Sequence, residues 1–433
     1  MNARFGLFYL LVFLFPACTF AGDVTLTLSE YQAQALRANH ELREAGFAAQ
    51  GADEAARGAF TGYFPKVSAA AGIANTNILP GLNSPIGLLP LTKDSNAASI
   101  GMITAVQPLY AGGRIANGNR LAKTGFAAAR QQLRAKRNEV LAESEKKYRQ
   151  LQVLNSKMLT LLAYEKLMDS LYAQVTEALE RGLATKTDAL RVKLKKEEIA
   201  VRKNQLGKLT ETAGKDLILY AGMAVSGAVR LGEQAETVAP ADYSTQSLRG
   251  QLETRPEYQL LQIGVDAAAL QKKIKIGGYL PSFAVGASVY RTDYYANANF
   301  SRDANYQDTV AFGMLSIPLS DWWEASHKIK EMRLKEDTAR EQLKALGDYL
   351  LLDMENKLRT LETAYDQVNL AQIEIEQAQA NKSEIEDGYK NGTEKLSDYL
   401  QALALELDSQ NKLVETKAEY FKAKTAFLLA TGQ

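Results

Sequence analysis

Residues that could carry acid–base, nucleophilic or metal chemistry are few in this sequence. It contains two histidines, His40 and His327, and one cysteine, Cys18. No metal-ligand spacing, phosphate-binding glycine loop or nucleophile motif accompanies them. His40 stands near the start of a predicted helix and is interpreted as a surface residue rather than a catalytic one. The carboxylates Glu197 and Glu198 lie among lysines, which is typical of a solvated helix face. The sequence therefore predicts no enzyme, no cofactor and no metal site.

The elements that surround these residues occur twice. Tyr63-Phe64-Pro65 recurs 216 positions later as Tyr279-Leu280-Pro281. Further along, Gln107-Pro108-Leu109 recurs 210 positions later as Ile317-Pro318-Leu319. Because the order is kept and the displacement changes only once, each half is predicted to be one structural unit, and such a repeat decides the architecture.

Each half is predicted to contain one very long helix. From 114 to 181 there is no proline, and apolar residues recur there in steps of three and four, as they do again from 343 to 375. At 1.5 Å per residue, the first of these helices would be on the order of 100 Å long.

Both long helices are predicted to end in a tip. They stop at Gly182 and Gly392 and restart within a few residues, because glycine accepts the positive φ of a helix C-terminus. Three residues can cap the return helices: Thr185, Thr187 and Ser397. A single hairpin of this kind is most simply a bundle connection. Two related tips on such long helices favour a docking surface.

Between the landmarks the period changes to two, which predicts strands. Phe283, Val285 and Val289 follow this period, and the alternation is weaker around 67–77 and 100–109, which a loop at 79–96 joins. Strands of about 10 to 12 residues suit a tilted crossing of a bilayer. Aromatic residues near the strand ends predict a belt at the membrane surface: Tyr63, Phe64, Tyr110, Tyr279, Tyr294, Tyr295, Trp322 and Trp323.

Four strands cannot close a barrel, and open sheet edges have no partners in lipid. Several chains must therefore share one barrel, and three copies would give twelve strands, an even number in the range of outer-membrane barrels. The predicted fold class is mainly α with a membrane β-barrel. It combines internally duplicated long helical hairpins with four β-strands per chain, which in three copies would contribute to a twelve-stranded trimeric barrel.

The N-terminus and the charge balance define the compartment. One basic residue, Arg4, precedes an apolar run and small residues, which predicts a secretory signal peptide over 1–21. Cleavage after Ala21 would remove Cys18, although the segment before Cys18 faintly resembles a lipoprotein acylation site, so acylation stays open. Lys and Arg number 51 against 50 Asp and Glu. This balance predicts no basic stripe and no nucleic-acid partner, and no later apolar run is long enough for a transmembrane helix.

The domain boundaries follow from these patterns. The first repeat is predicted over 22–222, with a helix, a β-hairpin at about 66–110 and a long helical hairpin at 114–222. A linker is predicted over 223–253. The second repeat is predicted over 254–433, with a helix, a β-hairpin at about 282–318 and a long helical hairpin at 320–431.

Five segments in this order resemble the TolC-type outer-membrane efflux proteins, the outer-membrane factors of tripartite pumps and type I secretion. They are Leu26-Thr27-Leu28-Ser29-Glu30, Gln107-Pro108-Leu109-Tyr110-Ala111-Gly112-Gly113-Arg114, Arg181-Gly182-Leu183-x-Thr185-x-x-Asp188, Arg255-Pro256-Glu257 and Gly392-Thr393-x-x-x-x-Asp398. The resemblance covers nearly everything from Thr25 to Gln433.

The resemblance implies a homotrimeric channel in the outer membrane of a Gram-negative bacterium, in which the long helical hairpins form a trimeric periplasmic tunnel. Its partners would be outer-membrane lipid, a periplasmic adaptor (membrane fusion protein) and an inner-membrane transporter. Adaptor docking is assigned to the tips, at Arg181, Gly182, Leu183, Gly392 and Thr393. The gate is assigned to Asp398, Tyr389, Asp188 and Gln401. Two positions depart from the family pattern: Gln401 stands where a second acid is usual, and Glu394 where a basic residue is usual.

Two other classes of protein share part of this pattern. A secreted coiled-coil structural protein or adhesin would also show long apolar seams, but it would not explain the strand pairs between repeated landmarks. A passive porin would be mostly strands. The sequence names neither the exported substrate nor the energy source of the inner-membrane transporter.

Overall fold

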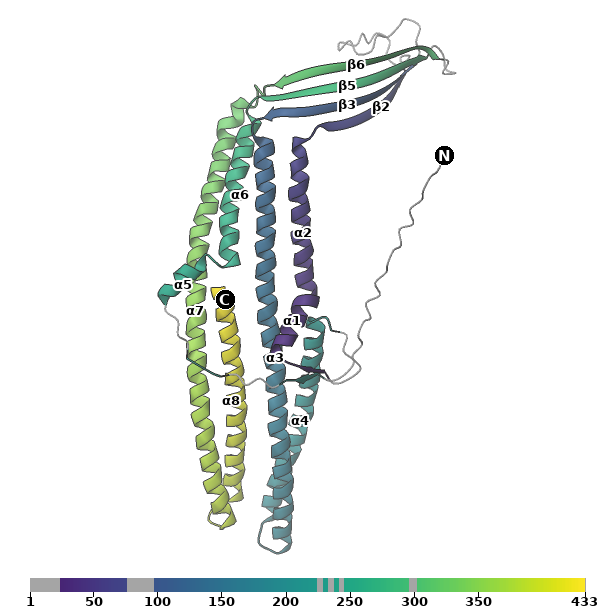
Figure 1. The fold of residues 1–433 in the computed structure, drawn as a ribbon. Coiled ribbons are helices and arrows are strands. Elements are labelled where there is room, and N and C mark those ends of the chain that lie inside the picture. Colours follow the sequence, from purple (N-terminus) through teal and green to yellow (C-terminus); the bar gives the residue numbers. More distant parts are fainter. Residues whose placement is uncertain are drawn as a thin grey trace, which may run out of the picture. The chain divides into compact units, whose positions relative to one another are not determined.

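The computed structural model describes residues 24–75, 97–223, 229–232, 237–240, 245–295 and 302–432 (Figure 1). The predicted signal peptide, Cys18 and the predicted loop at 79–96 lie outside these ranges. None of the described helices is both long enough and apolar enough to cross a membrane.

The order of the elements follows the duplication. The first half contains β1 (Val24–Leu26), α1 (Leu28–Ala38), α2 (His40–Phe60), a 3-10 turn (Thr61–Tyr63), β2 (Lys66–Asn75), β3 (Ala97–Ala111), α3 (Arg114–Glu180) and α4 (Lys186–Tyr220). The second half contains α6 (Pro256–Gly278), β5 (Ser282–Tyr295), β6 (Arg302–Ser316), α7 (Trp322–Lys390) and α8 (Leu396–Thr431). The predicted mainly helical fold, with duplicated long hairpins and paired strands, is confirmed.

The chain divides into two compact units, which we name by their content. The tip unit is built from Met1–Glu44, Ala135–Leu252 and Leu351–Gln433, and the sheet unit from Ala45–Arg134 and Glu253–Leu350. Both long helices contribute to both units, because α3 has 67 residues and α7 has 69 with no proline in either.

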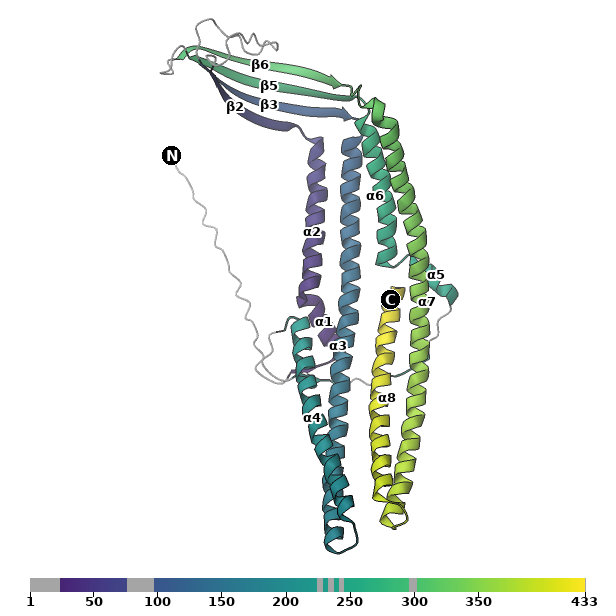
Figure 2. The same cartoon turned by 180° about the vertical axis from the view of Figure 1, so that it is seen from behind.

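In the tip unit each long helix packs against its return helix, α3 against α4 and α7 against α8, in both views (Figures 1 and 2). Cross-helix ion pairs join them: Lys203 to Glu165 at 2.8 Å and Lys412 to Glu374 at 2.7 Å. One shared apolar cluster draws on α3, α4 and α8, and its most buried members are Met168, Val175, Val192 and Leu403. The apolar seam predicted from the three-and-four spacing is therefore the core of this unit.

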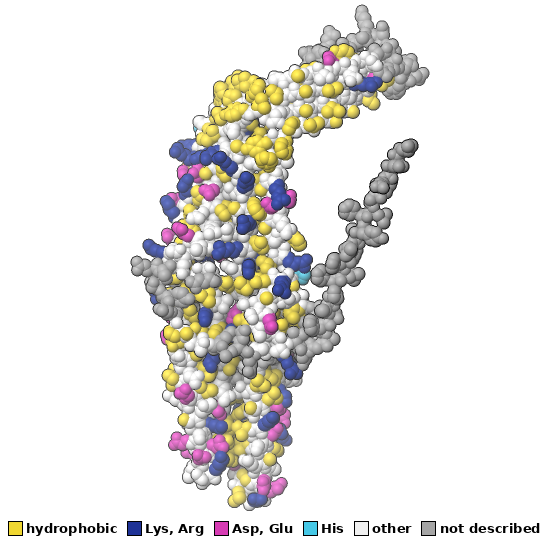
Figure 3. All heavy atoms as spheres, in the orientation of Figure 1, with side chains coloured by type: hydrophobic (Ala, Val, Ile, Leu, Met, Phe, Trp, Pro, Cys, Tyr) yellow, Lys and Arg dark blue, Asp and Glu magenta, His cyan; other side chains and the backbone are white. Residues whose placement is uncertain are grey.

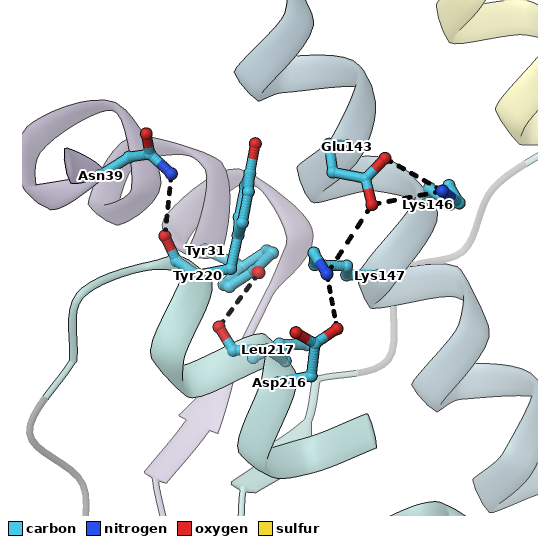
Figure 4. Close-up of polar contacts among 8 residues, drawn as sticks. All are labelled: Tyr31, Asn39, Glu143, Lys146, Lys147, Asp216, Leu217 and Tyr220. Carbon is cyan, nitrogen blue, oxygen red and sulfur yellow. Dashed lines mark hydrogen bonds and ion pairs between the residues drawn. The ribbon is translucent and has the colours of Figure 1, made fainter. Parts of the chain in front are cut away.

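The first helix, α1, docks on the end of α4 (Figure 4). Carbonyls in the last turn of a helix have no partner within the helix. Here the Tyr31 hydroxyl donates to the Leu217 carbonyl at 3.1 Å, and the Asn39 amide donates to the Tyr220 carbonyl at 3.1 Å. Burial raises the pKa of Tyr31, so its hydroxyl stays a donor. Beside it, Lys147 pairs with Asp216 at 2.5 Å.

The segment 223–253, predicted to be a linker, contains two regular elements in its described parts. Strand β4 (Val229–Leu231) pairs in parallel with β1, and α5 (Thr245–Leu252) buries Leu248 completely. The Tyr148 hydroxyl of α3 lies 3.1 Å from the carbonyls of both Leu26 and Gly232. The segment is thereby tied to α3 rather than simply joining the two halves.

The sheet unit contains a four-stranded antiparallel sheet in the order β2-β3-β5-β6. The two hairpins meet through β3 and β5, where Ile103 faces Val289 and Thr104 faces Ser288. The hydroxyls of Thr104 and Ser288 lie 2.9 Å apart. Since directly paired residues share a face, Ile103 and Val289 belong to one face and this hydroxyl pair belongs to the other.

The even charge balance conceals an uneven distribution, and α3 has a basic face that the overall count did not predict. Residues 114–138 of α3 contain seven Lys and Arg and no Asp or Glu. Arg120, Lys123, Arg130 and Arg134 recur at helical spacing, are exposed, and form no ion pair with any described residue. Figure 3 shows Lys and Arg side chains over the helices of the sheet unit.

Candidate functional site

Both hairpin tips of the tip unit are built by the same backbone motif. Gly182 and Gly392 each have φ of 75°, a left-handed conformation that glycine adopts at little cost. In the first tip, the N–H groups of Gly182 and Leu183 donate to the carbonyls of Leu179 and Ala178. The N–H groups of Gly392 and Thr393 bond in the same way. This double closure satisfies the last carbonyls of each long helix.

Asp188 and Asp398 are equivalent residues of the two repeats, but their carboxylates have different partners. Asp188 forms a capping box with Thr185: it accepts from the Thr185 N–H at 3.2 Å and hydroxyl at 2.6 Å. In the second tip the N-cap residue is Lys395, which has no side-chain acceptor. Among the described residues, the Asp398 carboxylate accepts a hydrogen bond only from the neighbouring Ser397 hydroxyl, at 3.2 Å. Asp188 is thus held as a cap, whereas Asp398 does not cap its helix.

The capping expectation needs one correction. Thr185 caps α4 as predicted, but Ser397 lies inside the first turn of α8 and is not its cap. Lys395 stands at the N-cap of α8, where Ser, Thr, Asp and Asn are preferred. Sequence spacing alone placed the cap two residues too late.

Tyr389 is held inside its own hairpin. Its ring stacks on Tyr399 of α8, with centroids 5.4 Å apart and planes 14° apart. Burial raises the pKa of Tyr389, and the negative charge of Asp188 raises it further. Burial raises the pKa of Tyr399 to about 12, with Glu386 adding to the effect. The charge of Asp188 in the first tip therefore acts on the hydroxyl of Tyr389 in the second. The fourth predicted gate residue, Gln401, is exposed.

The predicted docking residues are all exposed at the turns. Leu183 has 80% of its surface exposed, and Arg181 is held by Glu177 at 2.5 Å. Thr393 donates its hydroxyl to the Gly388 carbonyl at 3.0 Å. Glu394, which replaces a basic residue of the family pattern, is exposed beside it. The two tips therefore differ in their side chains, with an apolar one on the first and polar ones on the second.

In the sheet unit, most of the predicted belt residues are exposed where helices meet strands. Exposed fractions are 43% for Tyr63, 52% for Phe64 and Tyr110, 48% for Trp322 and 85% for Trp323. Tyr279 differs, since only 8% is exposed. It packs inside the junction, where its carbonyl accepts from the Trp322 indole at 2.8 Å. The Tyr294 side chain lies outside the described parts.

Sequence reasoning missed one member of this aromatic group. Phe60 is 54% exposed and contacts Tyr63 and Phe64, with ring centroids 5.5 and 5.6 Å apart. It ends α2, so a search restricted to strand ends passes over it, although its helical spacing to Tyr63 and Phe64 would have indicated it.

The residues with potential for enzyme chemistry are not brought together. His40 is exposed at the first position of α2, and His327 is exposed in α7. Among the described residues, no group of three or more His, Cys, Asp and Glu is arranged to hold a metal ion.

A family model matches most of the chain. Residues 32–207 and 248–433 match the model of the outer membrane efflux proteins. The chain belongs to the outer membrane efflux protein family. This membership confirms the resemblance found in the sequence and the predicted location in the outer membrane of a Gram-negative bacterium. It also removes support for the alternative of a secreted coiled-coil protein or adhesin.

Solved structures share the fold of this efflux protein. The outer membrane protein VceC of Vibrio cholerae is 17% identical with a TM-score of 0.77, covering 94% of this chain and 96% of that one. The CmeC outer membrane channel of Campylobacter jejuni is 17% identical with a TM-score of 0.76, and the match covers 94% of this chain and 85% of CmeC. The MtrE outer membrane channel of Neisseria gonorrhoeae, in its open state, is 14% identical with a TM-score of 0.75, and the match covers 94% of this chain and 88% of MtrE. No curated protein matches the sequence.

Proposed function

We propose that this efflux protein is the exit duct of a tripartite efflux or type I secretion system and works as a homotrimer. In this proposal three four-stranded sheets close one twelve-stranded barrel in the outer membrane. The helical hairpins form a periplasmic tunnel, and their tips meet a periplasmic adaptor that connects to an inner-membrane transporter.

The observation that carries the proposal is the open sheet. Within the described residues β2 and β6 each pair on one side only. Exposed apolar side chains line one face, including Val67 at 69%, Ile103 at 56% and Leu315 at 64%. Such a face favours lipid, where unpaired strand edges cost several kcal/mol per group. Pairing β6 of one copy with β2 of the next would remove every edge when the ring closes.

The helices of the tip unit support contacts between copies. Exposed apolar residues recur along α4 at Leu190, Leu194 and Val201, and along α7 at Leu370 and Ile373. Their charges are opposite, since α4 has nine basic and five acidic residues whereas 351–390 of α7 has four basic and nine acidic. Apolar stripes flanked by opposite charges favour side-by-side helix packing between copies.

Native mass spectrometry in detergent tests the assembly. Three chains are expected, because an isolated sheet would leave its edges unpaired. A predominant monomer that keeps its strand content would refute the architecture.

The proposed gate rests on the difference between Asp398 and Asp188. Three-fold symmetry would bring three Asp398 carboxylates together, where they would attract cations. In planar bilayers, Asp398→Ala should weaken cation selectivity and block by multivalent cations. The matched control is Asp387→Ala, which removes an exposed carboxylate from α7 near the same tip. Equal effects of both substitutions would show that the constriction lies elsewhere.

The proposed adaptor contact rests on the exposed tip of the first hairpin. Leu183→Ser should reduce export while leaving trimers intact, because an exposed leucine contributes little to folding but much to a hydrophobic contact. Leu159→Ser is the control, since Leu159 is 70% exposed on α3 away from the turn. Normal export by the Leu183 variant would argue against docking at this tip.

A further inference from the structure

One face of the sheet carries a groove of about 440 Å³ over strands β2, β3 and β5. Three alanines and Gly101 form part of its lining. Ala71, Gly101 and Arg291 form one row across the three strands, and Ala69, Ile103 and Val289 form another. Since alternate residues of a strand share a face, both rows lie on the same face. Arg291 and its β6 partner Gln307 therefore form a polar end of a groove whose remaining lining is mostly apolar.

Gly101 leaves the floor of the groove open. A Cβ atom added at Gly101 would meet nothing within 4 Å. The side chains of Ile103 and Val289 are 56% and 42% exposed beside it. The missing side chain leaves this position open, whereas well-packed sheet surfaces fill such positions with side chains.

The same face changes character along β5. Phe283, Val285 and Val289 are exposed apolar residues, and Arg291 and Asp293 follow them at the same alternation. A change from apolar to charged residues on one face of a strand is typical of the edge of a hydrocarbon layer. Figure 3 shows hydrophobic side chains over the sheet.

Arg291 retains binding capacity. Its side chain is 53% exposed, and its Nε and one terminal nitrogen bond the Asp293 carboxylate, with Nε 3.2 Å from Oδ2. The other terminal nitrogen, Nη1, has no hydrogen bond within the described part of the chain. A guanidinium presents five donors in a planar fork that suits phosphate. The Asp293 carboxylate holds this fork in place and also competes for it.

We propose that this groove binds a membrane lipid, with one acyl chain over Gly101 and a headgroup phosphate on Arg291. The proposal rests on the proposed function, because it requires this face of the sheet to lie in the bilayer. We favour a lipid over an exported solute because the groove face exposes Val67, Ile103 and Leu315 by more than half, whereas the opposite face includes the polar Thr104–Ser288 pair. An acyl chain that moves from the bilayer into the groove gains no hydrophobic free energy, because it is surrounded by hydrocarbon in both places. A preference for one lipid therefore comes from the phosphate contact and the shape of the groove.

The test titrates the detergent-solubilised oligomer with dioleoylphosphatidylglycerol and counts bound lipids by native mass spectrometry. Dioleoylglycerol, which lacks the phosphate, and inorganic phosphate, which lacks the chains, are the comparison probes. Phosphatidylglycerol should bind at least about fivefold more tightly than either, the ratio expected for one exposed ion pair of about 1 kcal/mol.

Two pairs of variants separate the headgroup contact from the groove. Arg291→Gln should weaken phosphatidylglycerol binding about fivefold, and Asp293→Asn should strengthen it because the competing carboxylate is lost. Gly101→Val should fill the groove and weaken binding. Its matched control, Gly72→Val, lies on the other face of β2, where an added Cβ would come 3.7 Å from Ile100.

Unchanged binding in both Arg291→Gln and Gly101→Val would overturn the proposal, as would equal binding of phosphatidylglycerol and dioleoylglycerol. Planar-bilayer conductance of the same preparations keeps the two ideas apart. Normal channels without lipid preference would refute only the lipid site. Absence of channels in the unmodified protein would refute the proposed function.

Discussion

The two tips allow a substitution that transfers the properties of one repeat to the other. Lys395 has φ −85° and ψ 152°, close to the −93° and 155° of Thr185. A threonine at 395 would therefore place its hydroxyl three residues before Asp398, as Thr185 is placed before Asp188. Lys395→Thr should complete a capping box and stabilise the first turn of α8 by about 1 kcal/mol.

This stabilisation has a functional cost that can be measured. Once the Asp398 carboxylate accepts bonds from residue 395, it is less available to cations in the duct. We expect hydrogen exchange in the first turn of α8 to slow by about fivefold, the equivalent of about 1 kcal/mol. In planar bilayers, block by multivalent cations should weaken at the same time.

Removal of the Lys395 charge needs its own control. Lys395→Gln removes the charge without providing a good cap, so it should leave hydrogen exchange nearly unchanged. If Lys395→Thr and Lys395→Gln behave alike, charge and not capping controls the tip. If Lys395→Thr alters neither exchange nor block, the reasoning from the first tip to the second is wrong.

Three further outcomes are expected. Gly112→Ala should lower the thermal midpoint more than Gly113→Ala, because both have positive φ but a Cβ at Gly112 would lie 2.1 Å from a carbonyl oxygen of α6. The overlap should add roughly 1–3 kcal/mol, and equal midpoints would contradict the close approach. Tyr148→Phe should destabilise the β1–β4 pair by about 1 kcal/mol, seen as faster hydrogen exchange in β1, and unchanged exchange would exclude this role. Burial raises the pKa of Tyr399 from its usual 10.0 to about 12 in the folded protein. As the pH rises, the unfolded state therefore loses the hydroxyl proton first. The free energy of unfolding should be unaffected by this group below pH 10 and should fall between pH 10 and 12. Tyr399→Phe should make this alkaline loss of stability smaller without abolishing it, because burial also raises the pKa of Tyr164 and Tyr220 to about 12. An unchanged stability–pH curve would show that Tyr399 does not contribute.

The repeated features could be predicted from sequence because they depend on local rules. Helical spacing of apolar residues and glycines at the turns fix long hairpins without knowledge of their neighbours. Thr185 could be identified as a cap because Asp188 follows it at the spacing of a capping box. The strand texture between the landmarks was visible for the same reason, since alternation is local.

What depends on distant partners could not be predicted. Tyr279 has the type and position of a belt residue, but its burial depends on Trp322, 43 positions away. The β1–β4 pair joins two strands of three residues each, too short to show a period. The basic face of α3 was missed because an overall charge balance averages over the chain, whereas charge acts over about 10 Å at moderate salt.

The unbroken length of α3 and α7 restricts how such a protein can change in evolution. One residue inserted in a helix turns everything beyond it by about 100° and advances it by 1.5 Å. A single insertion in either helix would therefore move the apolar seam out of its contacts, whereas seven residues, close to two full turns, would nearly restore it. The return helices would have to lengthen as well. Variation in the length of these hairpins among relatives should accordingly come in paired steps of seven residues, with the tips and the sheet kept in phase.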